Sequence, residues 1–386
     1  MKEILQLNAI SPVASAVLSS KYRLVKESQS PVGILLRSFK MHGFPLPDSL
    51  LAVARAGAGV NNIPIDECSK KGIVVFNTPG ANANAVKELV LCALLLSSRR
   101  IIPAIEWTKS LKGKGAEVSA LVEKGKQDFV GGEIAGKTLG VVGLGAIGAM
   151  VANDCVRLGM NVIGYDPFIS IDAAWGLNRS IKRMGGVDEL LAQSDYVSLN
   201  TPYNENTKHM INAKSIDKMK DGAVLINCSR GELVDNAAVI EAVKSGKIAR
   251  YVTDFPSDEL IGIDNIICIP HLGASTPEAE DNCAESAARE LADYIENGNI
   301  HNSVNFPECA LPRSGQSRIT IIHLNIKDML NKITSAISGS HHNICNFVNK
   351  SRGEYAYSII DIDEPADLQL KTALESIEGI MRVRLI

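Results

Sequence analysis

The sequence contains no CxxC pair and no cysteine or histidine spacing of the kind that holds a metal ion. Its eight cysteines are scattered singly along 386 residues. That distribution is typical of reduced thiols in a cytosolic protein. We therefore expect no disulfide framework and no bound metal, and a cytoplasmic location.

Long apolar runs and a strong charge imbalance are also missing. The longest apolar run, residues 89–96, is far too short to cross a bilayer. Asn8, Ser11 and Pro12 interrupt the first residues, which therefore lack the apolar core of a signal peptide. The formal net charge is −3, whereas a nucleic-acid-binding protein usually has a basic face. We expect neither a membrane nor a nucleic acid as partner.

Two series of short apolar runs, separated by helical segments, make up most of the chain. The first series has its runs at residues 32–36, 51–54 and 73–76. The second begins at Gly136 and has runs at 138–142, 161–165, 196–199, 223–227, 251–254 and 266–269. This βαβ rhythm predicts an α/β protein with two doubly wound parallel-sheet domains, of which the second is a Rossmann domain.

A third region, residues 318–386, has the order strand, helix, strand, strand, helix, strand. The order predicts a small separate βαββαβ domain of ferredoxin-like type. We expect residues 1–95 and 277–305 to form a discontinuous substrate domain, 96–276 the cofactor domain and 316–386 the tail domain. The apolar stretch 84–102 is expected to be a helix that connects the first two domains.

The most specific motif is glycine-rich. Gly143, Gly145 and Gly148 form a GxGxxG pattern between the strand at 138–142 and a helix at 146–158. Such glycines permit a tight turn, close approach of a pyrophosphate and helix–strand packing. Asp166 ends the next strand, where a carboxylate binds the adenosine ribose hydroxyls and repels a 2′-phosphate. The motif predicts NAD rather than NADP; the alternative is an ordinary turn.

Catalytic chemistry is indicated late in the second series. Arg230 and His271 each directly follow a predicted strand, and the acidic pair Asp258 and Glu259 lies between them in the sequence. Ligands of such sheets bind beyond the carboxyl ends of the strands. An imidazole transfers a proton, a carboxylate orients it, and a guanidinium grips a substrate carboxylate. The set predicts hydride transfer between NAD and a hydroxy or keto acid.

The stretches 136–166, 227–239 and 270–280, which carry these residues, resemble the D-isomer-specific 2-hydroxyacid dehydrogenases. The resemblance implies that Arg230, Glu259 and His271 are the catalytic set. Glu259 keeps the family's distance from Asp254 in a shortened stretch, and Asp258 is the alternative. The family commonly has Arg where this chain has Ala146, so one phosphate contact is expected to be missing. The implied cofactor-binding residues are Gly143, Gly145, Ala146, Ile147, Gly148, Asp166, Thr201, Pro202, Cys228, Ser229, Asp254 and Gly273.

Two arginines in the first series are candidates for binding the substrate. Arg37 and Arg55 each end a predicted strand, and Arg55 leads into a glycine-rich turn. Two guanidinium groups and the N–H groups of such a turn suit a doubly charged phosphate; the alternative is two ordinary surface arginines. The implied substrate-binding residues are Arg37, Ser38, Arg55, Ala58, Gly59 and Val60, with Lys40 as a weaker candidate.

The segments 34–38, 55–63 and 72–89 resemble the phosphoglycerate dehydrogenase branch of the family. That resemblance implies oxidation of 3-phospho-D-glycerate to 3-phosphohydroxypyruvate, the first step of L-serine biosynthesis. The alternatives are a hydroxypyruvate or glyoxylate reductase of the same family and a non-catalytic NAD-sensing binding protein. The paired arginines argue against the first alternative, and a turnover assay separates the second.

The tail resembles an ACT domain, a small amino-acid-sensing module. In serine-inhibited members of the family, a His-x-Asn pair and a later Asn hold L-serine at a tail–tail interface. His323, Asn325 and Asn343 match these positions, whereas the Pro-Gly of the family is replaced by Lys327-Asp328. The tail is thus either a serine site or a dimerisation module without a ligand. The family implies a homodimer or a homotetramer.

Overall fold

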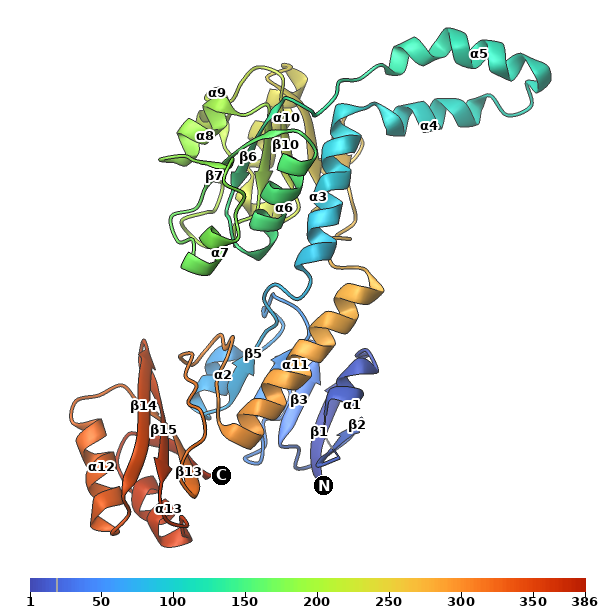
Figure 1. Cartoon of the computed structure of the whole chain (residues 1–386). Helices are drawn as coiled ribbons and strands as arrows, with labels where there is room; N and C mark the ends of the chain where they lie inside the picture. Colours follow the sequence, from blue (N-terminus) through green and yellow to red (C-terminus); the bar gives the residue numbers. More distant parts are fainter. Residues whose placement is uncertain (19) are drawn as a thin grey trace. The chain divides into compact units, whose positions relative to one another are not determined.

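The computed structural model of the chain describes residues 1–18 and 20–386. The chain separates into two compact units, one formed by Met1–Asn82 and Glu280–Ile386 and the other by Ala83–Ala279. Each unit contains a parallel β-sheet covered by helices, which confirms the predicted α/β class (Figure 1). Among the described residues, no helix combines the length and apolar character needed to span a lipid bilayer.

The first unit begins with a five-stranded sheet in the order β2-β1-β3-β4-β5. All of its pairs are parallel. The strands are β1 (Lys2–Leu7), β2 (Tyr22–Val25), β3 (Gly33–Leu36), β4 (Ala52–Arg55) and β5 (Val74–Phe76), with the short helices α1 (Val13–Val17) and α2 (Ile65–Lys70). Strands β3, β4 and β5 correspond to the predicted runs. Strands β1 and β2 were not predicted, although β1 lies inside the sheet, between β2 and β3.

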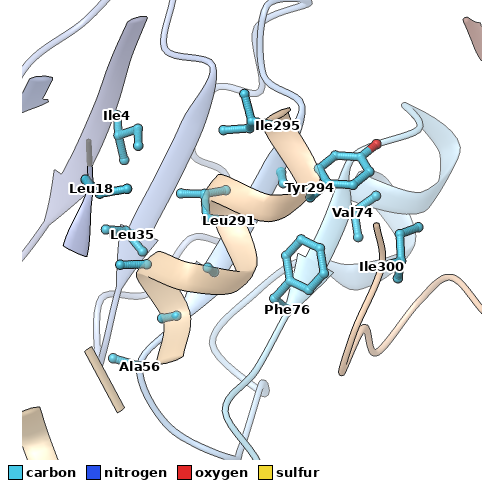
Figure 2. Close-up of a cluster of buried hydrophobic side chains, with 14 of the residues drawn as sticks. Ile4, Leu18, Leu35, Ala56, Val74, Phe76, Leu291, Tyr294, Ile295 and Ile300 are labelled. Atoms are coloured by element: carbon cyan, nitrogen blue, oxygen red, sulfur yellow. The ribbon is translucent and has the colours of Figure 1, made fainter. Parts of the chain in front are cut away.

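One face of this sheet is covered by α11 (Pro277–Asn297), most of which belongs to the first unit. Figure 2 shows Leu291 and Tyr294 of α11 packed among side chains from the strands, including Ile4 and Leu35. A Cβ on Gly33 would lie only 2.9 Å from the Leu291 side chain. The glycine therefore lets the helix approach the sheet closely.

The edge strand β5 is closed by a segment that follows α11. Asn305, which is buried, accepts a hydrogen bond from Val75 N (2.9 Å) and donates one to Ile73 O (2.9 Å). Phe76 and Ser303 form an antiparallel bridge nearby. The first sheet is thus completed by residues from late in the chain.

The second unit contains a seven-stranded parallel sheet in the order β12-β11-β10-β9-β6-β7-β8. Its strands are β6 (Thr138–Val142), β7 (Asn161–Tyr165), β8 (Lys182–Arg183), β9 (Tyr196–Leu199), β10 (Ala223–Asn227), β11 (Ile248–Thr253) and β12 (Ile266–Cys268). Its helices include α6 (Ala146–Arg157), α7 (Ile171–Trp175), α8 (Val187–Gln193), α9 (Ala213–Asp217) and α10 (Asn236–Lys244). The strand order reverses at β6, which lies between β7 and β9. This is the doubly wound arrangement that the sequence predicts.

The long apolar helix is α3 (Ala83–Ser98), and it belongs to the second unit. Its Val90 and Leu94 are buried in one cluster with Val151 and Cys155 of α6. The predicted domain limits at 95/96 and 276/277 therefore differ from the observed divisions at 82/83 and 279/280. After α3 the chain forms a helical hairpin of α4 (Ile101–Ser110) and α5 (Val118–Gly125), which projects from α3 (Figure 1).

The tail forms a separate antiparallel sheet in the order β14-β15-β13-β16. Its elements are β13 (Ser317–Leu324), α12 (Met329–Gly339), β14 (Ile344–Arg352), β15 (Tyr355–Ile362), α13 (Leu368–Glu375) and β16 (Ile380–Leu385). The predicted βαββαβ order is confirmed. A fully buried ion pair joins β13 and β15, with Arg318 Nε 2.6 Å from Asp361 Oδ1. Arg318 also donates to Asn297 O at 2.9 Å, which ties the tail to the end of α11.

Candidate active site

The loops that carry the predicted cofactor and catalytic residues follow strands β6, β7, β9, β10, β11 and β12. Because these strands are parallel, their carboxyl ends meet at one edge of the second sheet. The strand order reverses at β6, where Asn200 N donates to Val142 O at 2.7 Å. Such a reversal opens the crevice in which doubly wound sheets bind ligands.

Two glycines of the glycine-rich turn occupy positions where a Cβ atom would clash with the main chain. Gly143 has φ +87°, and a Cβ there would lie 2.6 Å from Asn200 O. A Cβ on Gly148 would lie 1.9 Å from Gly143 O, so only glycine permits the contact between α6 and the turn. Around Gly145, by contrast, no heavy atom lies within 4 Å of such a Cβ. This open space at the N-terminus of α6 fits the approach of a pyrophosphate.

Asp166 at the end of β7 is held by the main chain. Its Oδ2 accepts a hydrogen bond from Leu144 N, within the glycine turn, and its Oδ1 accepts one from Phe168 N, both at 2.8 Å. Each carboxylate oxygen has a second lone pair and can accept a further bond from a ribose hydroxyl. Together with the glycine turn, this set of residues fits the adenosine half of NAD.

The loop of Arg230 is shaped by Asn227, a fully buried residue that the sequence analysis did not single out. Asn227 Nδ2 donates to Arg230 O (2.8 Å), and Asn227 Oδ1 accepts from Ser229 N (3.1 Å). Ser229 Oγ in turn donates to Leu199 O at 2.9 Å. Arg230 itself is exposed, so its guanidinium is accessible to a ligand. Of the other predicted cofactor residues in these loops, Cys228 is buried and Thr201 is partly exposed.

The loop of His271 is held by Asp254, which is only 1% exposed. The Asp254 carboxylate accepts hydrogen bonds from Leu272 N (2.7 Å) and Gly273 N (2.8 Å). Burial raises the pKa of Asp254, and these two N–H groups act in the opposite direction. His271 has φ +55°, and its ring centroid lies 4.8 Å from that of Phe255. Asp254 was predicted as a cofactor residue; the structure shows in addition that it fixes the loop of His271.

Glu259 is exposed and is held by a residue that the sequence analysis missed. Asn236 Nδ2, at the first position of α10, donates to Glu259 Oε1 at 2.6 Å. The described part of the chain shows no ion pair between Glu259 and His271, nor any partner for the exposed Asp258. The roles of Glu259 and Asp258 therefore stay predictions. No signal in a single sequence identifies Asn236, because its contact with Glu259 depends on the conformation of the loop after β11.

The predicted substrate residues lie in the first unit, after β3 and β4. Leu36 and Arg55 are register partners, and Arg55 Nε donates to Arg37 O at 2.9 Å. The structure thus brings Arg37 and Arg55 together at adjacent strand ends. The Arg37 guanidinium forms an ion pair with Glu280, an acidic partner that was not predicted.

The neighbouring main chain is fixed by amide and hydroxyl groups. Asn8 Nδ2 donates to Ser38 Oγ at 3.0 Å, and Gly57 N donates to Thr78 Oγ1 at 2.8 Å. The turn formed by Ala58, Gly59 and Val60 stays partly exposed, and Lys40 is exposed. The loops after β3 and β4 therefore carry both cationic side chains and partly exposed main-chain groups.

The residues predicted to bind serine are not brought together within one chain. His323 pairs with Ala356 in the tail sheet, whereas Asn343 directly precedes Ile344, the partner of Ile362. Six residues of strand β15 separate these pairing positions, which corresponds to roughly 20 Å along the strand. His323 is 2% exposed, and burial lowers its pKa. The position of the missing family glycine, Asp328, has φ +66°.

The described residues contain no group of three or more His, Cys, Asp and Glu side chains arranged to hold a metal ion.

Comparison with known proteins places this geometry in a family. Residues 91–273 match the D-isomer specific 2-hydroxyacid dehydrogenase NAD-binding domain. A putative D-3-phosphoglycerate dehydrogenase of Schizosaccharomyces pombe is 33% identical over 374 residues, which cover 88% of this chain and 75% of that protein. The D-3-phosphoglycerate dehydrogenase of Haemophilus influenzae is 33% identical over 87% of this chain and 81% of its own. For the Escherichia coli enzyme the identity is 34%, over 88% and 82%.

Solved structures show the same fold. A glyoxylate reductase from Paecilomyes thermophila superposes with a TM-score of 0.63 at 26% identity, over 78% of this chain and 98% of that chain. An NAD+-bound 3-phosphoglycerate dehydrogenase from Entamoeba histolytica superposes with a TM-score of 0.60 at 24% identity, over 79% and 98%. With relatives more than 30% identical along most of both chains, this chain belongs to the D-isomer-specific 2-hydroxyacid dehydrogenases, NAD-dependent enzymes whose cofactor domain carries the glycine turn described above.

Proposed function

We propose that this chain oxidises 3-phospho-D-glycerate to 3-phosphohydroxypyruvate, the entry step to L-serine. The observation that carries the proposal is the pair Arg37 and Arg55 at adjacent strand ends, joined by the 2.9 Å hydrogen bond from Arg55 Nε to Arg37 O. Two guanidinium groups match the charge of a phosphate dianion, and each planar guanidinium can donate to two phosphate oxygens. The relatives named D-3-phosphoglycerate dehydrogenase, similar along most of the chain, support the same substrate.

In the proposed reaction NAD, when bound, accepts the hydride from C2 of the substrate. Arg230 binds the substrate carboxylate with its exposed guanidinium. His271 takes the proton of the C2 hydroxyl as the carbonyl forms, and returns it in the reverse direction. Glu259 stabilises the resulting imidazolium through its negative charge. Asp254 contributes by holding the main chain directly after His271, at Leu272 and Gly273.

Glu280 bears on the selectivity for phosphate. Its carboxylate neutralises Arg37 in the ligand-free chain. Both side chains are partly exposed, so the pair contributes only about 0–1 kcal/mol and a phosphate dianion competes with it easily. We expect substrate binding to exchange this ion pair for a stronger one with the phosphate.

The experiment is NADH oxidation by purified protein, with 3-phosphohydroxypyruvate and hydroxypyruvate compared side by side. We expect kcat/KM to be about 100-fold higher for the phosphorylated substrate, equivalent to about 2.7 kcal/mol of transition-state binding. Equal rates, or turnover of hydroxypyruvate and glyoxylate alone, would make the chain a reductase of the unphosphorylated acids. Binding of NADH without turnover of any of them would favour an NAD-sensing protein.

We also propose that the chain works in the cytoplasm as a homodimer or homotetramer, with L-serine bound between the tails of two copies. The distance of roughly 20 Å between the ends of the tail sheet supports this, because His323 and Asn325 of one copy need Asn343 of another to complete the set. L-serine should raise Tm and lower turnover, and D-serine serves as the control. If Tm and turnover both stay unchanged up to about 10 mM L-serine, the tail does not bind serine and serves only to associate two chains. Light scattering gives the number of copies.

A further inference from the structure

The first unit contains a second basic site, separate from the Arg37–Arg55 pair. A cavity of about 760 Å³ opens between the first sheet, the end of α11 and the tail. Six basic side chains line it: Lys2, Lys21, Arg313, Lys371, Arg382 and Arg384. They come from β1, the segment before β2, the linker to the tail, α13 and β16, so the cluster is assembled from distant parts of the chain.

The acidic side chains of the cavity do not balance this charge. Only Asp48, Glu296 and Glu375 line it. Glu296 pairs with Lys21 at 2.9 Å, and Glu375 with Lys371 at 3.6 Å. Of the other four basic groups, Arg313 donates to Ile386 O at 2.8 Å, and Asp48 is the one further acidic side chain among the lining residues.

The two arginines of β16 illustrate the imbalance. Arg384 donates to Tyr294 O (3.0 Å) and Ile295 O (2.6 Å), and Arg382 donates to Leu50 O (2.6 Å). Carbonyl groups satisfy the N–H donors but carry no net charge. Within the described chain, neither guanidinium forms an ion pair. Burial lowers the pKa of Arg382; Tyr294 and Asp48 act in the opposite direction, and Arg384 in the same direction as burial.

A purely structural role for these arginines accounts for part of the arrangement. Arg384 caps the C-terminus of α11, and a helix C-terminus carries about half of one negative charge. That is less than the full positive charge of Arg384, and Arg382 adds a second charge beside the carbonyl groups of Leu50 and Lys71. The positive charge that remains favours the binding of an anion.

We propose that this cavity binds a small metabolite with two or more negatively charged phosphate or carboxylate groups. Guanidinium and ammonium groups are the usual ligands of both. The volume lies in the range of about 300–1,000 Å³ typical of small-molecule sites, and is larger than one phosphate ion requires. A ligand here contacts β1, α11 and β16 together, so it stabilises the attachment of the tail to the first sheet. The proposal is independent of the substrate proposed above.

The test is isothermal titration of the full chain with pyrophosphate and, separately, with citrate, at constant ionic strength set with KCl. The variant is Lys2→Gln/Lys371→Gln, because Lys2 is exposed and Lys371 partly exposed, so neither is part of the buried packing. The matched control is Lys26→Gln/Lys332→Gln, which removes one exposed lysine from each of the same two regions but none from the cavity. Binding at Arg37 and Arg55 stays constant in all three proteins and is subtracted.

We expect the wild type and the control to bind at least one of the two anions, and the cavity variant to bind it about tenfold more weakly. The anion should also raise Tm of the wild type and the control, but not that of the variant. Pyrophosphate alone, citrate alone or both then identify the charged group that the cavity prefers. Equal affinities in all three proteins, or no binding beyond that at Arg37 and Arg55, would overturn the proposal.

Discussion

Asn236 Nδ2 lies 2.6 Å from Glu259 Oε1, and this hydrogen bond ties the loop after β11 to the first residue of α10. The same amide lies 3.3 Å from Ser257 Oγ. Glu259 is exposed, so without Asn236 its carboxylate would sample many rotamers. Asn236 therefore acts as a positioning residue for the carboxylate that is proposed to serve His271.

Replacing Asn236 with Ala should lower kcat about tenfold with little change in KM, because the loss affects the transition state more than substrate binding. Steady-state NADH oxidation with 3-phosphohydroxypyruvate measures both constants. Asn331→Ala is the control, since Asn331 also donates to a carboxylate, that of Asp328 at 3.1 Å, but lies on α12 of the tail. A kcat of Asn236→Ala equal to that of the control would exclude the positioning role.

Replacing Arg37 with Ala should reduce kcat/KM for 3-phosphohydroxypyruvate by about 100-fold, because one of two phosphate-binding guanidiniums is lost. The value for hydroxypyruvate should stay within a factor of about two to three. Arg289→Ala is a matched control, because Arg289 is also an exposed arginine paired with a glutamate, Glu285 at 2.7 Å. An equal loss of kcat/KM for both substrates would show that Arg37 stabilises the fold or binds the substrate carboxylate and does not bind the phosphate.

Two glycines of the cofactor turn should respond differently to the same substitution. In Gly148→Ala the new Cβ meets Gly143 O at 1.9 Å, so we expect Tm without NAD to fall by about 4 °C or more. In Gly145→Ala the new Cβ has no heavy atom within 4 Å, so the substitution should leave that Tm unchanged. It should nevertheless weaken NADH binding about tenfold, since the methyl group occupies space that the pyrophosphate needs. Fluorescence titration with NADH measures the affinity. Unimpaired NADH binding by Gly145→Ala would contradict the assigned cofactor position.

Glu290 on α11 should make stability depend on pH. Its Oε2 is buried without a hydrogen-bond partner, and Asn302 Nδ2 donates to Oε1 at 2.7 Å. Burial raises the pKa of Glu290 from its usual 4.5 to about 7, against the opposing effect of Asn302. The folded state thus favours the protonated acid, and this stability is complete below about pH 4.5 and is lost as the pH rises through about 7.

Glu290→Gln removes this titration. Its Tm should match that of the wild type at pH 5 and exceed it by about 2–4 °C at pH 8, where the wild type has a buried charge. Glu27→Gln, a change at an exposed glutamate, is the control. A Tm difference between Glu290→Gln and the wild type that is the same at both pH values would rule out titration of Glu290 as the cause.

The elements that the sequence predicts well are those whose residues share one environment. The strands β6, β9 and β10 are buried on both faces, so their apolar runs are continuous and their ends are clear. Site residues such as Arg230 and His271 could be located because they directly follow such strands. Strand β1 was missed because it begins with Lys2 and Glu3, and its place between β2 and β3 follows only from long-range pairing.

Contacts that depend on loop geometry could not be predicted. The Asp254 carboxylate meets two main-chain N–H groups 18 and 19 residues later, and Arg37 meets Glu280 across more than half of the chain. Nothing in the local sequence around either residue selects its partner. The division at 82/83 also depends on packing, because the apolar face of α3 fits α6 of its own unit.

The discontinuous first unit sets an order of folding during synthesis. Residues 83–279 form a contiguous unit that has all of its strands once the ribosome has passed Ala279. The first sheet is translated earlier, yet the face covered by α11 and the edge closed by Asn305 stay open until those residues emerge. Nascent chains that end shortly after Ala279 should thus show slow hydrogen exchange in residues 83–279 and fast exchange in residues 1–82. The first-made part of this protein is therefore the part that needs chaperone protection for longest.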